Sequence, residues 1–183
     1  LTLYAFSPEN WGRPQAEVDA IMELFCKTVM NEAEELCRQG VKVQIMGERT
    51  RFSERVLEMI DHIERTTAAA DRLTLILAFN YSSRREITLA VRDIAAKVAR
   101  GEIAAESIDE EVISQHLMTA STPDPDLIIR TSGECRLSNF LLWQASYAEM
   151  YFPQTLWPDF REEEFDKALE VYAERERRYG LVK

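Results

Sequence analysis

The stretch Leu73-Thr-Leu-Ile-Leu-Ala-Phe79, which runs directly into Asn80-Tyr-Ser-Ser-Arg84, decides the fold of this chain. Apart from Thr74 the first part is apolar, as expected for a β-strand with both faces covered by helices. Polar residues follow at once, and an amphipathic pattern then predicts a helix from about Arg85 to Arg100, closed by Gly101. This junction of strand, loop and helix is typical of a parallel sheet.

The same alternation extends towards the amino terminus. Leu1–Phe6 reads as a short strand, followed by turn residues and a helix from about Pro14 to Gln39 that Gly40 ends. Alternating Val41, Val43 and Ile45 predict the next strand, and a second amphipathic helix follows it. The apolar face of the first helix consists of Val18, Ile21, Met22, Phe25, Val29, Ala33 and Leu36, and that of the second of Val56, Leu57, Ile60 and Ile63.

The carboxyl-terminal part continues the pattern with a helix over about 110–118, a strand over 126–130 and a charged helix over 162–178. Strands that alternate with helices predict an α/β fold with a mainly parallel central sheet flanked by helices. At 183 residues, the chain has the length of one domain, and we expect 1–183 to form a single one.

The overall composition excludes several classes of function and location. The net charge is -10, with 32 acidic against 22 basic residues, so a nucleic-acid partner is not expected. Three scattered cysteines suggest neither a zinc site nor disulfides, which favours a reducing, cytoplasmic location. No apolar run approaches the roughly 20 residues of a transmembrane helix. We therefore expect a cytoplasmic protein without a transmembrane segment.

Three loops at the carboxyl ends of predicted strands combine arginine with small polar residues, and ligands of open parallel sheets gather at such loops. Guanidinium groups bind phosphate oxygens in forked pairs, so the loops suit a phosphate or diphosphate, although any one arginine could equally form a surface ion pair. Neither a P-loop nor a GxGxxG sequence is present, which weakens nucleotide hydrolases and dinucleotide enzymes. The loops hold Ser7, Asn10 and Arg13; Asn80, Ser82, Ser83 and Arg84; and Arg130, Thr131, Ser132, Gly133, Arg136 and Ser138.

These loops coincide with longer blocks that resemble the cis-prenyltransferase family, specifically bacterial undecaprenyl diphosphate synthases. Leu1–Pro14 with Glu17-Val18 is similar to that family's second block, and Asn80–Ile87 to its middle block. Asp124-Pro-Asp-Leu-Ile-Ile-Arg-Thr-Ser-Gly-Glu-Cys-Arg-Leu-Ser-Asn-Phe-Leu-Leu-Trp-Gln144 resembles its most specific block. Tyr147–Glu149, Trp157–Phe160 and Arg175–Gly180 resemble the blocks that end the family's sequences.

The resemblance implies an Mg²⁺-dependent enzyme that condenses isopentenyl diphosphate with an allylic diphosphate, here farnesyl diphosphate. Its product would be a polyprenyl diphosphate such as undecaprenyl diphosphate, the lipid-carrier precursor for cell-wall synthesis, delivered to the membrane. It also implies a homodimer. Residues Ile21, Met22 and Phe25 would line the tunnel for the growing chain, although an ordinary core explains them equally well.

The resemblance also assigns site residues. It makes Asn10 the proton acceptor and Glu149 a metal ligand, although Glu149 by its spacing alone would be a structural residue. Arg13 would position the allylic diphosphate, whereas Arg130, Arg136 and Ser138 would hold that of isopentenyl diphosphate. The substrate-binding residues that it implies are Ser7, Pro8, Glu9, Trp11, Arg13, Arg130, Arg136, Leu137 and Ser138.

Two departures from the family pattern stand out. Ser82 and Ser83 replace glycines of the middle block, so a loop that needs positive φ there would be strained. The family's first block, with an Asp-Gly-Asn-Gly-Arg loop that binds Mg²⁺ and the allylic diphosphate, is absent. Because a buried strand opens the chain, we expect further residues before Leu1 and expect these 183 residues alone to be inactive.

Two other functions compete with this interpretation. A non-catalytic subunit of the same fold would have lost site residues, but all six are retained, namely Asn10, Arg13, Arg130, Arg136, Ser138 and Glu149. A general phosphate-ester enzyme is the other alternative, since a fold does not fix a function. Diphosphate release that requires both prenyl substrates distinguishes a prenyltransferase from it.

Overall fold

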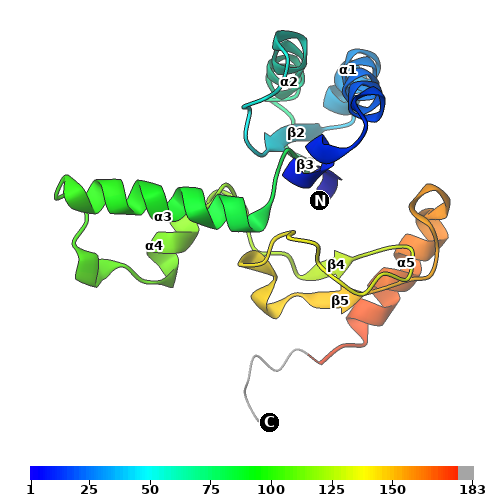
Figure 1. Ribbon diagram of the computed structural model, residues 1–183. Coiled ribbons are helices and arrows are strands. Elements are labelled where there is room, and N and C mark those ends of the chain that lie inside the picture. The colour runs from blue at the N-terminus through cyan, green and yellow to red at the C-terminus, as the bar shows by residue number, and fades with distance from the viewer. Residues whose placement is uncertain (177–183) are drawn as a thin grey trace. The chain divides into compact units, whose positions relative to one another are not determined.

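The computed structural model describes residues 1–176, which divide into two compact units (Figure 1). Leu1–Thr119 form the first unit, and the second begins at Ala120. All described strand pairs in both units are parallel. The α/β class with a parallel sheet flanked by helices is therefore confirmed, while the single domain expected from the sequence stays a prediction.

The first unit holds a three-stranded sheet in the order β1-β3-β2. Its central strand has the predicted bounds, and its register pairs Leu77 with Leu3 on one side and with Ile45 on the other. The register of the first strand shifts between Tyr4 and Phe6. The elements of this unit are β1 (Thr2–Phe6), η1 (Pro8–Gly12), α1 (Gln15–Arg38), β2 (Val41–Met46), α2 (Glu54–Thr66), β3 (Leu73–Phe79), α3 (Ser83–Ala99), η2 (Ala105–Ser107) and α4 (Glu110–Gln115).

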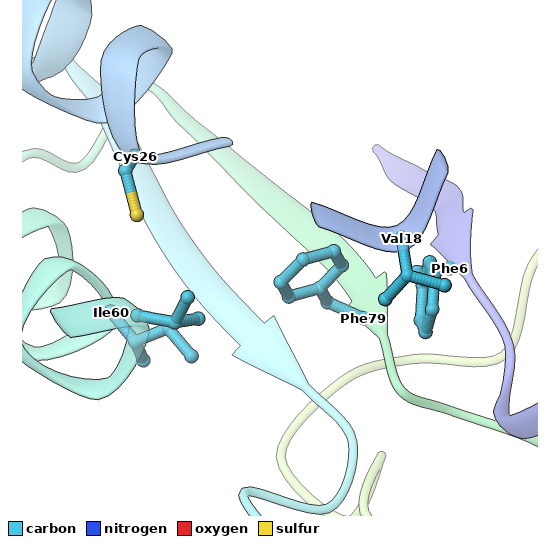
Figure 2. Close-up of a cluster of buried hydrophobic side chains, with 6 residues drawn as sticks. Phe6, Val18, Cys26, Ile60 and Phe79 are labelled. Atoms are coloured by element: carbon cyan, nitrogen blue, oxygen red, sulfur yellow. The ribbon is translucent and has the colours of Figure 1, made fainter. Parts of the chain in front are cut away.

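Helices α1 and α2 lie next to each other over one face of this sheet (Figure 1). Figure 2 shows the core where α1, α2 and the ends of β1 and β3 meet, with Phe79 between residues of both helices and Phe6 beside Val18. Fully burying a side chain of this size stabilises a fold by about 1.5–3 kcal/mol. The core fixes the place where β1 and β3 end and the candidate loops begin.

The predicted apolar face of α1 is confirmed. Val18, Val29 and Ala33 are buried, and Ile21, Met22, Phe25 and Leu36 pack against the same clusters. Helix α1 ends one residue before the expected Gln39, and Gly40 follows with a φ of 78°. These contacts give Ile21, Met22 and Phe25 a packing role in the core.

The second unit contains one parallel pair of short strands and a helix. The strand expected over 126–130 is one residue shorter at each end. The helix expected to reach Arg178 ends at Ala173. The part of that prediction from Arg177 on lies outside the described residues. Its elements are β4 (Leu127–Ile129), η3 (Gln144–Tyr147), β5 (Glu149–Tyr151), η4 (Trp157–Asp159) and α5 (Glu162–Ala173). In residues 1–176, no helix has the length and apolar character needed to cross a membrane.

Candidate functional site

The first candidate loop is the single tight turn η1 that follows β1. The backbone N–H of Ser7 donates to Asn10 Oδ1 at 2.8 Å, and the backbone N–H of Asn10 donates to the Ser7 carbonyl at 3.0 Å. Pro8 occupies the first position of the turn, where its missing N–H costs nothing. The turn thus holds the Asn10 amide in a fixed orientation.

Arg13 follows this turn and is open to solvent. Its backbone N–H donates to the Asn10 carbonyl at 3.0 Å, which ties the residue to η1. Its side chain is 52% exposed and reaches Glu17 only at 3.9 Å. Such a loose surface pair contributes at most about 1 kcal/mol, so an anionic ligand can displace it at little cost.

Trp11 lies among aromatic and charged side chains of two other segments. Its ring centroid is 5.1 Å from that of Phe6 and 5.8 Å from that of Phe52, and the Arg51 guanidinium carbon lies 4.6 Å from the centroid of the indole ring. The indole N–H donates to Asn80 Oδ1 at 2.8 Å. Trp11 is therefore held from several sides.

A tyrosine of β1 adds a neutral hydroxyl beside this loop. The Tyr4 hydroxyl donates to the Tyr81 carbonyl at 3.2 Å. Burial raises the pKa of the Tyr4 phenol, whereas a hydrogen bond with the Ser7 side chain acts in the opposite direction. The phenol therefore stays protonated at neutral pH and joins the loop after β1 to the loop after β3.

Three of the four polar residues of the second loop, after β3, are buried, and the fourth, Arg84, is exposed. Asn80, Ser82 and Ser83 are 3%, 6% and 0% exposed, and the positive φ of this loop falls on Asn80, at 58°. Ser82 has an extended φ of -151° and Ser83 begins α3. The serines therefore sit in ordinary conformations, and the strain expected from the glycine replacements does not arise.

A buried carboxylate holds this second loop in place. Glu86 is 1% exposed and accepts hydrogen bonds from the Tyr81 hydroxyl at 2.6 Å and from the Met118 N–H at 2.9 Å. Hydrogen bonds to a charged group are worth about 1.5–3 kcal/mol each. Glu86 thus helps to hold the loop after β3 in place, and the phosphate-binding role that its exposed Arg84 suggests stays a prediction.

The third loop, after β4, brings three of the predicted site residues together. Arg130 Nη1 donates to the Arg136 carbonyl at 2.6 Å and to Ser138 Oγ at 2.7 Å. The Arg136 guanidinium, which is 61% exposed, forms an ion pair with Glu134. Leu137 lies between the two contacted residues. The Arg130 guanidinium thus joins the Arg136 backbone and the Ser138 hydroxyl, while the Arg136 guanidinium is exposed in the same loop.

The backbone of this third loop is strained at several positions. Ser132, Ser138, Asn139 and Leu141 all have positive φ, between 46° and 69°. Such conformations of residues other than glycine cost on the order of 1–3 kcal/mol each and cluster at functional sites. Backbone bonds anchor the loop, since the Ser132 N–H donates to the Thr155 carbonyl at 2.8 Å and the Gly133 N–H to the Pro153 carbonyl at 2.8 Å.

Glu149 begins β5 and pairs with Leu127 of β4. Its carboxylate is 29% exposed and lies 3.9 Å from Arg175 Nε, at the limit of an ion pair. Residues 1–176 contain no cluster of three or more His, Cys, Asp or Glu side chains able to hold a metal. Mg²⁺ is often held by one or two carboxylates plus substrate phosphates, and a single accessible carboxylate fits that arrangement.

The predicted site residues thus form two groups, each within one unit. Ser7, Pro8, Glu9, Asn10, Trp11 and Arg13 share one loop; Arg130, Arg136, Leu137 and Ser138 share another, with Glu149 on β5 of the same unit. Sequence reasoning missed the link from Asn80 to Trp11 and the stacking of Arg51. A polar residue directly after a buried strand was the available signal for Asn80.

Comparisons with known proteins identify the family of the chain. A family model described as putative undecaprenyl diphosphate synthase matches residues 1–180. The chain is 50% identical over 182 residues to the ditrans,polycis-undecaprenyl-diphosphate synthase, (2E,6E)-farnesyl-diphosphate specific, of Xanthomonas axonopodis, covering 100% of this chain and 71% of that protein. It is 49% identical over 180 residues to the enzyme of the same name from Escherichia coli, covering 98% and 71%.

Solved structures give the same result. Lavandulyl diphosphate synthase from Lavandula x intermedia, in complex with dimethylallyl diphosphate, matches with a TM-score of 0.95 at 39% identity, over 98% of this chain and 78% of that one. A probable undecaprenyl diphosphate synthase from Campylobacter jejuni matches with a TM-score of 0.86 at 36% identity, over 98% and 82%. The chain belongs to the undecaprenyl diphosphate synthase family of cis-prenyltransferases.

Proposed function

We propose that this protein is a chain-elongating cis-prenyltransferase that condenses isopentenyl diphosphate with farnesyl diphosphate to give a polyprenyl diphosphate such as undecaprenyl diphosphate. The observation that carries the proposal is the group of Arg130, Arg136 and Ser138 in the loop after β4. Relatives about half identical to this chain bear names that state this product and farnesyl diphosphate specificity.

The third loop binds isopentenyl diphosphate in this proposal. The exposed Arg136 guanidinium and the Ser138 hydroxyl supply donors, and Leu137 lies between them. Arg130 adds positive charge and holds the loop in shape through the Arg136 carbonyl. Guanidinium groups form forked hydrogen bonds to phosphate oxygens, which gives a local positive site in a protein of net charge -10.

The loop after β1 serves the allylic substrate. Arg13, open to solvent, positions its diphosphate, while Ser7, Pro8, Glu9 and Trp11 shape the surroundings. During condensation the allylic carbon–oxygen bond breaks, a carbon–carbon bond forms with isopentenyl diphosphate, and that substrate loses a proton. Asn10 is the proposed acceptor, and the Ser7 N–H fixes the direction of its amide oxygen.

Glu149 holds Mg²⁺ in this proposal, together with phosphate oxygens of the substrate. Bound Mg²⁺ would neutralise charge on the departing diphosphate. The carboxylate is accessible, and its contact with Arg175 at 3.9 Å is weak enough to be exchanged for a cation. The partners that complete the proposal are a second copy of the chain, as a homodimer, and the membrane that receives the product.

An elongation assay tests the proposal. Purified protein is incubated with farnesyl diphosphate, labelled isopentenyl diphosphate and Mg²⁺, and the products are separated by chain length. We expect long labelled products and diphosphate release only when both substrates are present. Release from one substrate alone would indicate a phosphate-ester enzyme, and elongation that requires an added partner subunit would indicate a non-catalytic relative.

The assay compares two forms of the protein. One consists of the 183 residues, which contain no Asp-Gly-Asn-Gly-Arg sequence, and the other carries an upstream segment with that sequence. We propose that only the longer form elongates. Glu149→Gln in that form should lower the rate and raise the Mg²⁺ concentration needed for half-maximal rate. Glu162→Gln, at the exposed start of α5, is the matched control.

A further inference from the structure

The ends of all three strands of the first unit meet at one buried side chain, that of Asn80. Its Nδ2 donates to the Glu48 carbonyl at 2.7 Å and to the Thr50 carbonyl at 3.2 Å, both in the loop after β2. Its Oδ1 accepts the Trp11 indole N–H, from the loop after β1. Asn80 itself directly follows β3. One amide therefore joins three segments that are distant in sequence.

The backbone around Asn80 supports this junction. Its own carbonyl accepts the Glu48 N–H at 3.2 Å, and the next residue, Tyr81, donates its N–H to the Phe6 carbonyl at 3.3 Å. Asn80 has a φ of 58°, a left-handed conformation that asparagine adopts more readily than most residues. Only an amide side chain can both donate to two carbonyls and accept an indole N–H from one position.

The contact with Trp11 reaches the loop that carries Asn10. An indole has one donor, and here it is given to Asn80. The Arg51 guanidinium lies over the ring, and the rings of Phe6 and Phe52 contact it at steep angles. Asn10 and Trp11 are consecutive in a turn that backbone hydrogen bonds close. The bond from the indole to Asn80 therefore anchors the turn that also carries Asn10 and the adjoining Arg13.

We propose that Asn80 is a positioning residue that fixes the turn bearing Asn10 and Arg13 through the indole N–H of Trp11. The proposal rests on the function proposed above, in which that turn serves the allylic substrate. Asn80 makes no contact with substrate itself, because its amide is 3% exposed and bonded within the protein. Its removal should impair the allylic half of the reaction and leave the isopentenyl diphosphate half intact.

The test uses Asn80→Gly, which tolerates a positive φ and removes the amide. In the form of the protein that elongates, we expect kcat/KM for farnesyl diphosphate to fall about tenfold, equal to about 1.4 kcal/mol, with the affinity for isopentenyl diphosphate unchanged. In the ¹⁵N–¹H spectrum, the Trp11 indole signal, identified by its loss in Trp11→Phe, should shift. An unmoved signal or an unchanged kcat/KM overturns the proposal.

Trp11→Phe and the double variant decide whether the two residues act as one unit. If Asn80 acts through the indole N–H, the double variant should lose no more than about twofold beyond the Trp11→Phe variant. Losses that multiply overturn the proposal. If the glycine variant fails to fold, Trp11→Phe alone serves: it removes the indole N–H, leaves the Asn80 amide bonded to the Glu48 and Thr50 carbonyls, and should likewise lower kcat/KM for farnesyl diphosphate, so an unchanged kcat/KM overturns the proposal.

Thr67→Val is the control for a general loss of stability. It removes a fully buried hydrogen bond to the Val43 N–H at the end of α2, away from η1 in the sequence. We expect this variant to leave kcat/KM within about twofold of the parent protein. The indole spectra are recorded without substrate. A longer form that does not elongate would therefore reject the proposed function, while the indole comparison would still decide whether Asn80 contacts Trp11.

Discussion

The loop after β1 and the loop after β4 carry the two groups of predicted site residues, and they are held in different ways. In the first, Trp11 is packed between side chains from other segments and bonded to the buried Asn80. In the second, Arg130 bonds to the backbone and side chain of its own loop, at Arg136 and Ser138. The first loop depends on tertiary packing, and the second on local charge-assisted contacts.

The two loops also differ in backbone conformation. The turn at Pro8–Gly12 contains no residue with positive φ, whereas the loop after β4 has four such residues besides Gly133. A relaxed turn can be displaced by a change elsewhere in the core, but a strained loop needs its own contacts to persist. Substitutions far from the site should therefore affect the first loop, and substitutions within the loop should affect the second.

The largest effect is expected from Gly47→Ala, in the support of the first loop. Gly47 has a φ of 145°, and an added Cβ would collide with the Phe79 carbonyl oxygen beside Asn80. Since backbone atoms cannot move aside as a flexible side chain can, we expect the free energy of unfolding to fall by about 3 kcal/mol or more. Urea denaturation, followed by tryptophan fluorescence, measures this loss.

Gly101→Ala separates the collision from the backbone conformation. Gly101 also has a positive φ, of 73°, but an added Cβ there would meet no atom within 4 Å. Its replacement should cost only about 1 kcal/mol, the penalty of the left-handed conformation. Equal losses of unfolding free energy in the two variants would show that the collision at Gly47 adds no cost beyond that of the backbone conformation.

Arg130→Met tests the second loop and should have the next largest effect. The variant loses the contacts to the Arg136 carbonyl and to Ser138 Oγ as well as the charge. Since hydrogen bonds to charged groups contribute about 1.5–3 kcal/mol each, the dissociation constant for isopentenyl diphosphate should rise about 30- to 100-fold. Isothermal titration calorimetry measures it directly.

Arg161→Met is the matched control for that variant. Arg161 is an exposed arginine of the same unit, directly before α5. Its replacement should leave the dissociation constant within about twofold of the parent value, because exposed charges interact weakly. If both variants lose affinity equally, the overall charge of the unit, rather than the geometry of the loop, attracts the diphosphate.

Sequence patterns predicted the elements with continuous apolar periodicity and missed the irregular ones. The bounds of β3 agree with the prediction, and those of α1 differ by about one residue, because burial on the sheet enforces the periodicity. The backbone conformation of the segment after Arg130 could not be predicted in this way. Its positive φ values fall on Ser132, Ser138, Asn139 and Leu141, and no glycine marks those positions.

The candidate site shows the same division. Arg130 and Ser138 lie within one short loop, so a local pattern of arginine and hydroxyl residues was sufficient to group them, although their hydrogen bond was not predicted. The partners of Asn80 lie 69, 32 and 30 residues away, and no local pattern indicates that its amide is buried. The sequence therefore favoured a phosphate-binding role for a residue that the fold uses as a support.

A pH-dependent ion pair gives a smaller test of the support around the first loop. The Arg85 guanidinium hydrogen-bonds to Glu48 and lowers the pKa of that carboxyl below its usual value. A lowered folded-state pKa stabilises the protein above the unfolded pKa of about 4.3, and this stabilisation is lost as pH falls through the folded value. Glu48→Gln should therefore cost at most about 1 kcal/mol at pH 7 and nothing at strongly acidic pH.

Urea unfolding of the parent protein and the variant from pH 3 to pH 7 measures this difference. Glu102→Gln is the control, since Glu102 pairs with Arg100 only two residues away and joins no separate segments. A difference between parent and Glu48→Gln that grows as the pH falls would contradict the sign of the expected effect. A difference no larger than that of the control would show that the pair adds nothing to the support around Asn80.

The smallest expected effect separates strain from binding in the second loop. Ser132 has a φ of 69°, so Ser132→Gly relieves the strain while the backbone bond to the Thr155 carbonyl stays in place. The net gain in unfolding free energy should be about 0.5 kcal/mol, because glycine also gives the unfolded chain more freedom. Thr131→Gly, next to it and without a positive φ, should instead lose about 0.5–1 kcal/mol.

If Ser132→Gly is more stable and binds isopentenyl diphosphate as tightly as the parent, the Arg130 contacts alone shape the loop. A weaker affinity despite greater stability would mean that the strained backbone itself presents Arg136 and Ser138, and the local contacts of this loop would then be only part of what distinguishes it from the loop after β1.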